Sequence, residues 1–295
     1  MELRHLRYFI TVAEELHFSR AAERLQIAQP PLSQQIRCLE EELGVQLFER
    51  TKRRVQLTDA GQVFLLEARR VLTQLEQAVM MAQRASRGEI GRLGVGVNAT
   101  AAQSFLPEIL RVFRERFPDV ELVLHELASH KQAQGIREDQ IDIGFLYLPI
   151  IDDSAFSFMS VLREPLIVAL PETHPLAGLP EIPLSALVNE SFVLPPRHLG
   201  PGFYDQIINL CHQAGFSPKV AQEAILVQTI VSLVAGGVGV ALVPASLQNL
   251  QRVGVIYKAL QGQTPELEMA AVWRQDNSSS VLQEFLKVVR EIAPK

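Results

Sequence analysis

The apolar positions near the N-terminus repeat at helical spacing. The first stripe predicts an amphipathic helix over residues 3–16, and it consists of Leu6, Phe9, Ile10, Ala13 and Leu16. Ser19 is a good N-cap for a second, shorter helix. A third stripe predicts a helix that ends at Gly44, and its apolar residues are Leu32, Ile36, Leu39 and Leu43. Short helices therefore account for most of the first 44 residues.

The polar face of the third helix can take part in recognition. Pro30 and Pro31 suit its first turn, where a missing N–H costs nothing. The remaining face carries four polar side chains, Gln29, Ser33, Gln34 and Arg37. Such side chains can contact base edges and phosphates, and two short helices with a free polar face are typical of a helix-turn-helix. An ordinary helical hairpin with a solvated face fits the periodicity at least as well, because the turn lacks the usual glycine.

Two short apolar runs follow the helices, at Leu47–Phe48 and Val55–Leu57, and they predict strands. The loop between them carries a basic run that contains Arg50, Lys52, Arg53 and Arg54. Beside a recognition helix, such a hairpin is a wing whose charges would contact the phosphate backbone, adding affinity without reading sequence. A solvated basic loop is the alternative, and we favour phosphate contact.

A long helix is predicted from Thr58, which can cap it, to about Arg87. Its apolar residues alternate spacings of four and three without a break, at Phe64, Ala68, Val71, Leu75, Ala78 and Ala82. A heptad seam this regular favours a partner helix from a second chain. A helix packed on its own domain is the alternative, but the short polar join at residues 86–89 favours a linker that holds a dimer together.

The hydrophobic period changes after residue 91. Apolar runs predict strands near residues 93–97, 120–124, 141–145, 165–170, 192–194, 219–221, 238–243 and 267–273. Helical patterns lie between and after them, near residues 105–117, 131–137, 203–214, 227–235 and 281–292. This alternation predicts an α/β fold with a largely parallel sheet. We interpret it as two similar halves with a ligand cleft between them and crossovers near residues 162–163 and Glu266.

The length of 295 residues suits two or three units, and a hydrophobic fraction of 47% is ample for their cores. We expect a winged helix-turn-helix unit over residues 1–58 and a linker or dimerisation helix over 59–88. The remaining α/β unit, 89–295, should have two subdomains. We assign residues 91–162 and 268–295 to subdomain I, and residues 163–267 to subdomain II.

Charge and cysteine content restrict the class of protein. A net charge of −5 does not indicate a nucleic-acid binder, but the average hides the short basic run in the wing. The two cysteines cannot form a disulfide framework, and we expect Cys38 to be a small core residue of the third helix. The chain starts with charged residues and no apolar run approaches a membrane span, so we expect a cytoplasmic protein.

Several residues resemble catalytic motifs. Gly94, Gly96 and Ala99 match the spacing of a dinucleotide fingerprint, but only two residues of strand precede the first glycine. The glycines at 236, 237 and 239 lack the lysine and hydroxyl of a phosphate loop, so they read better as a helix end before a tightly packed strand. No histidine pair has metal-site spacing, and no serine lies in a nucleophile elbow. We therefore expect no enzyme, metal or cofactor. A nucleotide-dependent enzyme and a small-molecule-binding module without a DNA role remain as alternatives.

Several segments of the sequence resemble those of the LysR-type transcriptional regulators. The matching segments are Leu6-Arg7-Tyr8-Phe9, Ala21-Ala22, Gln29-Pro30-Pro31-Leu32-Ser33-Gln34-Gln35-Ile36, Leu39-Glu40, Leu43-Gly44, Leu47-Phe48-Glu49-Arg50 and Leu57-Thr58-Asp59-Ala60-Gly61. The resemblance implies a DNA-binding regulator with a C-terminal domain similar in fold to periplasmic solute-binding proteins. The partners that it implies are near-palindromic promoter DNA, a small effector and RNA polymerase. It also implies that copies of the chain assemble as a dimer of dimers.

The resemblance also assigns DNA contacts. Gln29, Pro30, Ser33 and Gln34 match family positions that enter the major groove. Arg50 and Arg53 match phosphate contacts, with Lys52 and Arg54 as helpers. The family usually has a basic residue near Gln34 or Gln35, where this chain has glutamines. The resemblance therefore does not carry over a preferred DNA sequence.

A binding site for an anion is predicted at three segments that precede helices. They are Asn98-Ala99-Thr100, Ser129-His130 and the run around Pro201, Gly202 and Phe203. Helix N-termini offer free N–H groups, so a carboxylate or phosphate metabolite is favoured. Phe203 and Val227 could supply an apolar wall. The chain resembles the branch of the family that senses acids such as muconate, which implies that Ser129, Pro201 and Phe203 line the pocket. The alternative role for Thr100 and Ser129 is helix capping.

Overall fold

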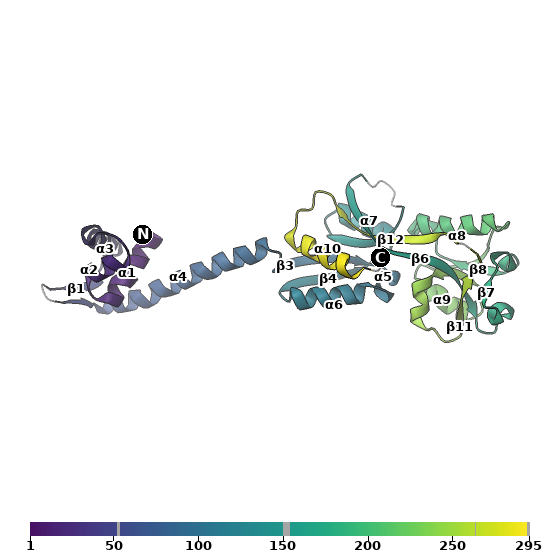
Figure 1. Ribbon diagram of the computed structural model, residues 1–295, viewed down its shortest axis with the longest axis horizontal. Coiled ribbons are helices and arrows are strands. Elements are labelled where there is room, and N and C mark those ends of the chain that lie inside the picture. The colour runs from purple at the N-terminus through teal and green to yellow at the C-terminus, as the bar shows by residue number, and fades with distance from the viewer. Residues whose placement is uncertain (52–53, 150–153, 263, 294–295) are drawn as a thin grey trace. The chain divides into compact units, whose positions relative to one another are not determined.

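A computed structural model describes residues 1–51, 54–149, 154–262 and 264–293. Its contacts divide the chain into two compact units, Met1–Arg84 and Ala85–Lys295, which Figure 1 colours from purple to yellow along the sequence. We describe each unit separately. None of the helices in the described part of the chain combines the length and apolar character that a membrane span needs.

The N-terminal unit consists of helices followed by a hairpin and a long helix. Its elements are α1 (Leu3–Glu15), α2 (Phe18–Arg24), α3 (Gln29–Leu43), β1 (Phe48–Arg50), β2 (Val55–Leu57) and α4 (Asp59–Ser86). The strands pair antiparallel, as a wing requires. The predicted stripe of α3 is buried at Leu32, Ile36 and Leu39, where it packs with Phe9 of α1. Gly44 ends α3 with a positive φ of 72°, so the predicted glycine cap is confirmed.

Two predictions for this unit were wrong. Helix α2 begins at Phe18, and its N-cap is His17 rather than Ser19, because the His17 ring accepts a hydrogen bond from the N–H of Arg20. Cys38 is exposed on α3 and is not a core residue, since the buried stripe runs through other positions of the helix. The other thiol, Cys211, is buried, and burial raises its pKa to about 11.

The first half of α4 is anchored to its own unit. Thr58 caps the helix as predicted, accepting a hydrogen bond of 2.9 Å from Gly61 N–H. Gly61 lies so close to the residue before β1 that a Cβ there would be 2.1 Å from the carbonyl oxygen of Leu47. Phe64 meets the ring of Phe9 edge-on at 5.0 Å. The start of α4 is therefore fixed by packing against the helix-turn-helix.

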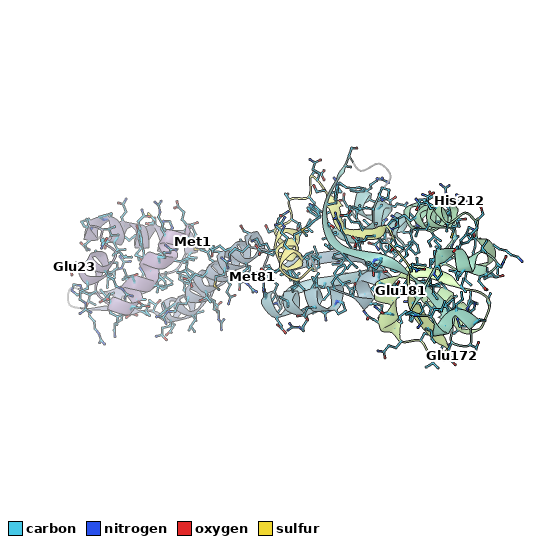
Figure 2. The ribbon with its side chains drawn as sticks, turned by 45° about the vertical axis from the view of Figure 1, so that its right-hand side comes forward. Met1, Glu23, Met81, Glu172, Glu181 and His212 are labelled. Carbon is cyan, nitrogen blue, oxygen red and sulfur yellow. The ribbon has the colours of Figure 1, made fainter. Side chains whose placement is uncertain are left out.

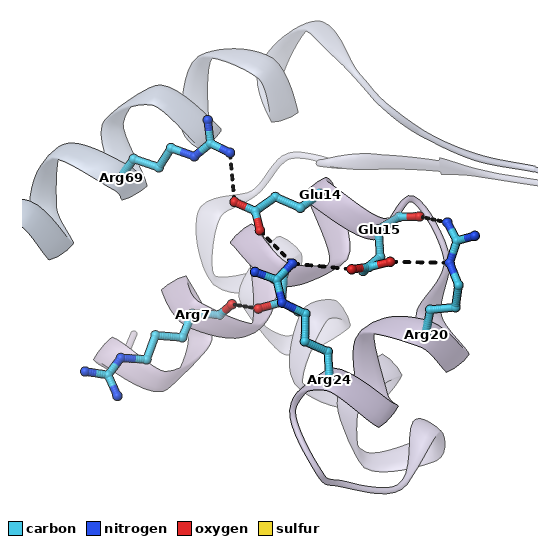
Figure 3. A network of polar contacts seen from close by, with 7 residues as sticks. Arg7, Glu14, Glu15, Arg20, Arg24 and Arg69 are labelled. Carbon is cyan, nitrogen blue, oxygen red and sulfur yellow. Dashed lines mark hydrogen bonds and ion pairs between the residues drawn. The ribbon is translucent and has the colours of Figure 1, made fainter.

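Ion pairs extend this attachment at the surface (Figure 3). Glu14 of α1 contacts Arg69 of α4 at 2.9 Å and Arg24 of α2 at 2.9 Å. Arg24 and Arg20 also pair with Glu15. The hydrogen bond from Arg69 lowers the pKa of Glu14 below its usual value. Paired charges therefore join three helices of the N-terminal unit.

The C-terminal unit is an α/β structure. Its strands are β3 (Gly91–Val97), β4 (Val120–Glu126), β5 (Ile143–Tyr147), β6 (Phe156–Pro171), β7 (Glu181–Ile182), β8 (Ser191–Leu194), β9 (Lys219–Glu223), β10 (Ala241–Pro244), β11 (Val255–Leu260) and β12 (Glu266–Arg274). Its α-helices are α5 (Ala99–Gln103), α6 (Leu106–Arg116), α7 (Ser129–Arg137), α8 (Pro201–Gln213), α9 (Val227–Ala235) and α10 (Ser280–Ile292). The sequence did not predict α5, β7 or β11, which are short or weakly patterned.

Two long strands join the halves of this unit. The first half contains β3–β5, α5–α7 and α10, and the second half contains β7–β11, α8 and α9. Strands β6 and β12 pair antiparallel from Glu266 opposite Pro165 to Arg274 opposite Phe156, at the positions where the sequence places the two crossovers. The sheet order is β4-β3-β5-β12-β6-β11-β7, with β10 also on β6. The sheet is mixed rather than largely parallel, because the strands around the crossovers run antiparallel.

Each half has its own hydrophobic core. The first core includes Phe113 and Phe145 and is covered by Phe285 of α10. The second core includes Phe192 and Ile207. The predicted interpretation of the glycines at 236–239 is confirmed, since Gly237 has a φ of 74° at the end of α9 and a Cβ on Gly239 would lie 2.3 Å from the carbonyl oxygen of Ser191.

Candidate functional site

The exposed face of α3 carries the polar residues that the sequence singled out. Gln29, Gln34 and Arg37 are exposed, and Pro30 is exposed in the first turn. Ser33 is half-buried and accepts a hydrogen bond of 3.3 Å from the Gln29 amide. These side chains are free to meet a flat or grooved surface, and the donor and acceptor groups of the glutamines match those of base edges.

The wing is tied to α3 through Glu40. One oxygen of Glu40 accepts hydrogen bonds from the N–H groups of Leu47 and Phe48, at 2.9 and 3.0 Å. The other oxygen pairs with Arg50 at 2.5 Å, and the Arg50 guanidinium lies 4.9 Å from the centre of the Phe18 ring. Arg50 therefore holds α2, α3 and the wing together, a role that the sequence did not predict. Arg54 is exposed, whereas Lys52 and Arg53 lie outside the described residues.

The apolar seam of α4 divides into two parts. Phe64 and Ala68 pack on the core of the N-terminal unit. Further along, Val71 is 48% exposed, Ala78 and Ala82 are exposed, and Leu75 is half-buried. Met80 and Met81 are about half exposed as well, at 55% and 48% (Figure 2). The second part therefore presents apolar side chains that the N-terminal unit does not cover.

A cavity of about 350 Å³ lies within the C-terminal unit. The first half contributes Ser129, His130, Ala133, Arg137, Leu146, Tyr147 and Pro149, and the second half contributes Gly200, Pro201, Gly202 and Phe203. The lining is mainly apolar, and it also includes the hydroxyl-bearing Ser129 and the charged Arg137. Because both halves line it, a molecule bound there would contact the two halves at once.

Two helix N-termini meet at this cavity. Helix α7 begins at Ser129 after the cap position Ala128, and α8 begins at Pro201 after Gly200. Neither cap position supplies a side-chain hydrogen bond within the described chain. No cap side chain covers the start of either helix, although Pro201 itself has no N–H to donate, and the positive ends of both helix dipoles favour an anion.

An aromatic pair closes one side of the cavity. Tyr147 of β5 and Phe203 of α8 stack with ring centroids 5.8 Å apart and planes within 15°. The Tyr147 hydroxyl is 2.6 Å from Thr100 Oγ1 and 3.5 Å from Glu164 Oε1. Burial raises the pKa of Tyr147 well above its usual value, so this hydroxyl stays protonated.

Gln132 positions the start of α7 against β5. Its side-chain oxygen accepts a hydrogen bond of 2.9 Å from Phe145 N–H, and its amide nitrogen donates to the Leu127 carbonyl at 2.8 Å. A Cβ on Gly96 would lie 2.8 Å from this oxygen, and one on Gly144 would lie 2.7 Å from it. Gly96, one of the two glycines that resemble a dinucleotide fingerprint, therefore makes room together with Gly144 for a buried glutamine.

Two family models cover nearly the whole chain. Residues 3–62 match the bacterial regulatory helix-turn-helix protein of the lysR family, and residues 86–294 match the LysR substrate binding domain. The chain belongs to the LysR family of transcriptional regulators. It is a DNA-binding regulator, as the resemblance implied, and its fold agrees with the predicted winged helix-turn-helix, long helix and two-part α/β domain.

Individual LysR relatives agree over the full length. The chain is 41% identical to the transcriptional regulator AlsR of Bacillus subtilis, over 98% of this chain and 95% of the relative. It is 38% identical to the regulator CatR of Pseudomonas putida, over 99% and 100%. A crystal structure of full-length CbnR complexed with its target DNA superposes with a TM-score of 0.84 at 29% identity, covering 100% of both chains. These relatives are regulators rather than enzymes.

The structure separates the residues predicted to bind the effector. Ser129, Pro201, Gly202 and Phe203 line the cavity together. Asn98 caps α5, accepting a hydrogen bond of 2.9 Å from Ala101 N–H, and Ala99 follows it, half-buried. Thr100 is 2% exposed and lies behind Tyr147. Val227 packs on a separate cluster of the second half that contains Ile230 and Val234.

The sequence reading missed several residues at or behind this cavity, and three of them carry polar or charged groups. Tyr147 and Arg137 line it, and Glu164 lies behind Tyr147. Glu164 could have been noticed in the sequence, because it is a lone carboxylate just before the apolar run from Leu166 to Leu170. Among the described residues, no group of three or more His, Cys, Asp or Glu side chains is arranged to hold a metal ion.

Proposed function

We propose that the regulator responds to a small anionic metabolite, a carboxylate above all, that binds in the cavity between the two halves of the C-terminal unit. The observation that carries this proposal is the meeting of two uncapped helix N-termini, with the Ser129 hydroxyl, beside the stacked Tyr147 and Phe203. An organic acid meets both needs, since its carboxylate suits the N–H groups and its carbon skeleton suits the aromatic wall.

The metabolite acts by favouring one arrangement of the two halves over another. A ligand shifts such an equilibrium only by the difference between its affinities for the two states. The cavity satisfies this requirement, because Ser129 belongs to the first half and Phe203 to the second. The change in the paired DNA-binding units would then alter contacts with promoter DNA and with RNA polymerase.

On DNA, α3 enters the major groove and the wing contacts phosphates. Gln29 and Gln34 read base edges, Ser33 supports Gln29, and Pro30 lies against a thymine methyl group. Arg37, Lys52, Arg53 and Arg54 contact the phosphate backbone, while Arg50 mainly positions the wing. The likeness to CbnR, whose structure contains its target DNA, supports this assignment.

Dimerisation through α4 brings two such units to the half-sites of a near-palindrome. Contacts between C-terminal units of different dimers would then form a dimer of dimers. The exposed second part of the seam, from Val71 to Ala82, supports this proposal.

Leu75→Glu would bury an unpaired charge in the seam and should convert dimers to monomers. Sedimentation analysis of the full chain would show the change, and Thr73→Glu on the exposed face of α4 is the matched control. Equal behaviour of the two variants would contradict the seam.

The carboxylate site can be tested by thermal unfolding with muconate, benzoate, succinate and inorganic phosphate as probes. A ligand at about 100 times its dissociation constant adds about 2.7 kcal/mol to the free energy of unfolding. We expect at least one carboxylate to stabilise the wild type, and Ser129→Ala to weaken that effect while leaving ligand-free DNA binding unchanged.

Ser232→Ala, on the exposed face of α9, is the control for the loss of a helical serine hydroxyl. It should respond to the carboxylate as the wild type does. If a carboxylate binds and Ser129→Ala and Phe203→Ala both respond to it as the wild type does, the ligand does not occupy this cavity.

A further inference from the structure

Glu164 is a buried carboxylate at the point where the two halves join. It lies on β6 immediately after the crossover and is 5% exposed. Its Oε2 accepts a hydrogen bond of 2.6 Å from Ser246 N–H, and its Oε1 is 3.2 Å from the Ser246 hydroxyl. Oε1 also faces the Tyr147 hydroxyl at 3.5 Å. Polar groups from both halves therefore converge on one carboxylate.

Tyr147 connects this carboxylate to the cavity. Its ring lines the cavity and packs against the hydrophobic cores of both halves. Its hydroxyl lies between Thr100 on one side and Glu164 on the other. A ligand that moves the ring must therefore also move the hydroxyl relative to Glu164.

The neighbours of Glu164 supply hydrogen bonds but little positive charge. Tyr147 is the titratable group that faces it from β5, and Ser246 faces it from the turn after β10. On β12 the opposite residue is Leu267. Arg163 pairs instead with Glu268 at 3.0 Å on the exposed surface. Burial consequently raises the pKa of Glu164 above its usual value, and the hydrogen bonds from Ser246 only partly oppose this effect.

We propose that Glu164 is a positioning residue of the anion cavity, which fixes the aromatic wall through Tyr147 and takes up a proton from solvent when an anion enters. This inference rests on the proposed function, because it concerns the same cavity. An anion against Tyr147 and an ionised Glu164 behind it repel each other in a poorly solvated site. Linkage is reciprocal, so protonation of Glu164 strengthens anion binding and a bound anion favours protonated Glu164.

The link between Glu164 and Tyr147 can be tested without a ligand. Thermal unfolding of the full chain is measured for Tyr147→Phe, Glu164→Gln and the double variant at one pH. If the two groups act through each other, the double variant should lose no more melting temperature than the worse single variant. Melting temperature losses that simply add would overturn the link. Glu172→Gln, an exposed carboxylate of the second half, is the matched control (Figure 2).

Proton uptake can be tested by calorimetric titration of muconate at pH 5.5 and pH 8. The wild type should gain more affinity on acidification than Glu164→Gln, by roughly tenfold for two charges that interact across a partly buried site. His130 also lines the cavity, but it is present in both proteins, so the difference isolates Glu164. Equal gains would overturn the proposed protonation.

The two proposals can fail separately. If none of the probe anions binds the wild type at either pH, the proposed effector site fails. The ligand-free comparison of Tyr147→Phe and Glu164→Gln still decides the positioning role: additive losses overturn it and non-additive losses support it.

Discussion

The carboxylates that join the helices and the wing of the N-terminal unit have different partners from the buried carboxylate beside the cavity of the C-terminal unit. In the N-terminal unit, Glu14 and Glu40 each meet an arginine. In the C-terminal unit, Glu164 is buried and meets hydroxyls and a backbone N–H instead. Arginine stays charged at every ordinary pH, so the first arrangement holds its geometry constant. The second leaves a group that can change its charge. The N-terminal unit therefore holds these two carboxylates in fixed ion pairs, whereas the C-terminal unit contains a buried carboxylate that can change its charge beside the cavity.

The largest expected effect comes from breaking the arrangement at Glu40. Glu40→Ala leaves the N–H groups of Leu47 and Phe48 without acceptors and removes the partner of the half-buried Arg50. We expect a loss of about 3 kcal/mol in the free energy of unfolding of the N-terminal unit and a large loss of DNA binding. Chemical denaturation and a gel-shift assay measure these two quantities.

Glu41→Ala removes a neighbouring carboxylate that is exposed, and it serves as the control. Its effect on stability should be within about 0.5 kcal/mol. If the two variants lose the same stability, Glu40 does not hold the wing.

An intermediate effect is expected where the N-terminal unit meets DNA. Gln29→Ala should cost about 1–3 kcal/mol on the specific operator and much less on random DNA, because it removes a base contact and leaves the phosphate contacts intact. Fluorescence anisotropy with both DNAs at one salt concentration provides the comparison. Equal losses on the two DNAs would show that Gln29 does not read a base.

The smallest effect is a pH dependence of opposite sign in the two units. Glu14 has a lowered pKa, so its contribution to stability is present above its unfolded value and is lost as the pH falls through the folded value. Glu164 has a raised pKa, so stability is lost as the pH rises from the unfolded value through the folded one. Calorimetry of the full chain from pH 4 to pH 8 should show this loss in the wild type and less of it in Glu164→Gln. An identical slope for the variant would mean that Glu164 has the same pKa in both states.

The reading surface was largely predictable from sequence. Its residues are neighbours along one helix, so the spacing of Leu32, Ile36 and Leu39 defined the buried face and left Gln29 and Ser33 on the other. The same local reasoning placed the caps at Thr58 and Gly44. This reasoning failed at Ser19, because a ring nitrogen of His17 can accept the capping hydrogen bond in place of a serine hydroxyl. It also failed at Cys38, because a small side chain carries little information about burial.

The cavity was only partly predictable, because it forms from segments that lie far apart in the chain. The rule that helix N-termini bind anions identified Ser129 and Phe203. The roles of Tyr147 and Glu164 depend on the register between β5, β12 and β6, which periodicity does not determine. The bonds of Arg50 likewise depend on how the wing folds back onto α3.

The return of the chain through β12 has a consequence for biosynthesis. The first half of the C-terminal unit begins at residue 91, but its core is completed by Phe285 and its neighbours on α10, near the end of the chain. During translation the DNA-binding unit can fold early, whereas this half must wait for almost the whole polypeptide. A prematurely terminated chain would therefore retain a folded DNA-binding unit without a complete C-terminal unit. Under the proposed function, such a product would occupy promoters without responding to the effector, so mutations that shorten the chain should behave as dominant rather than recessive alleles.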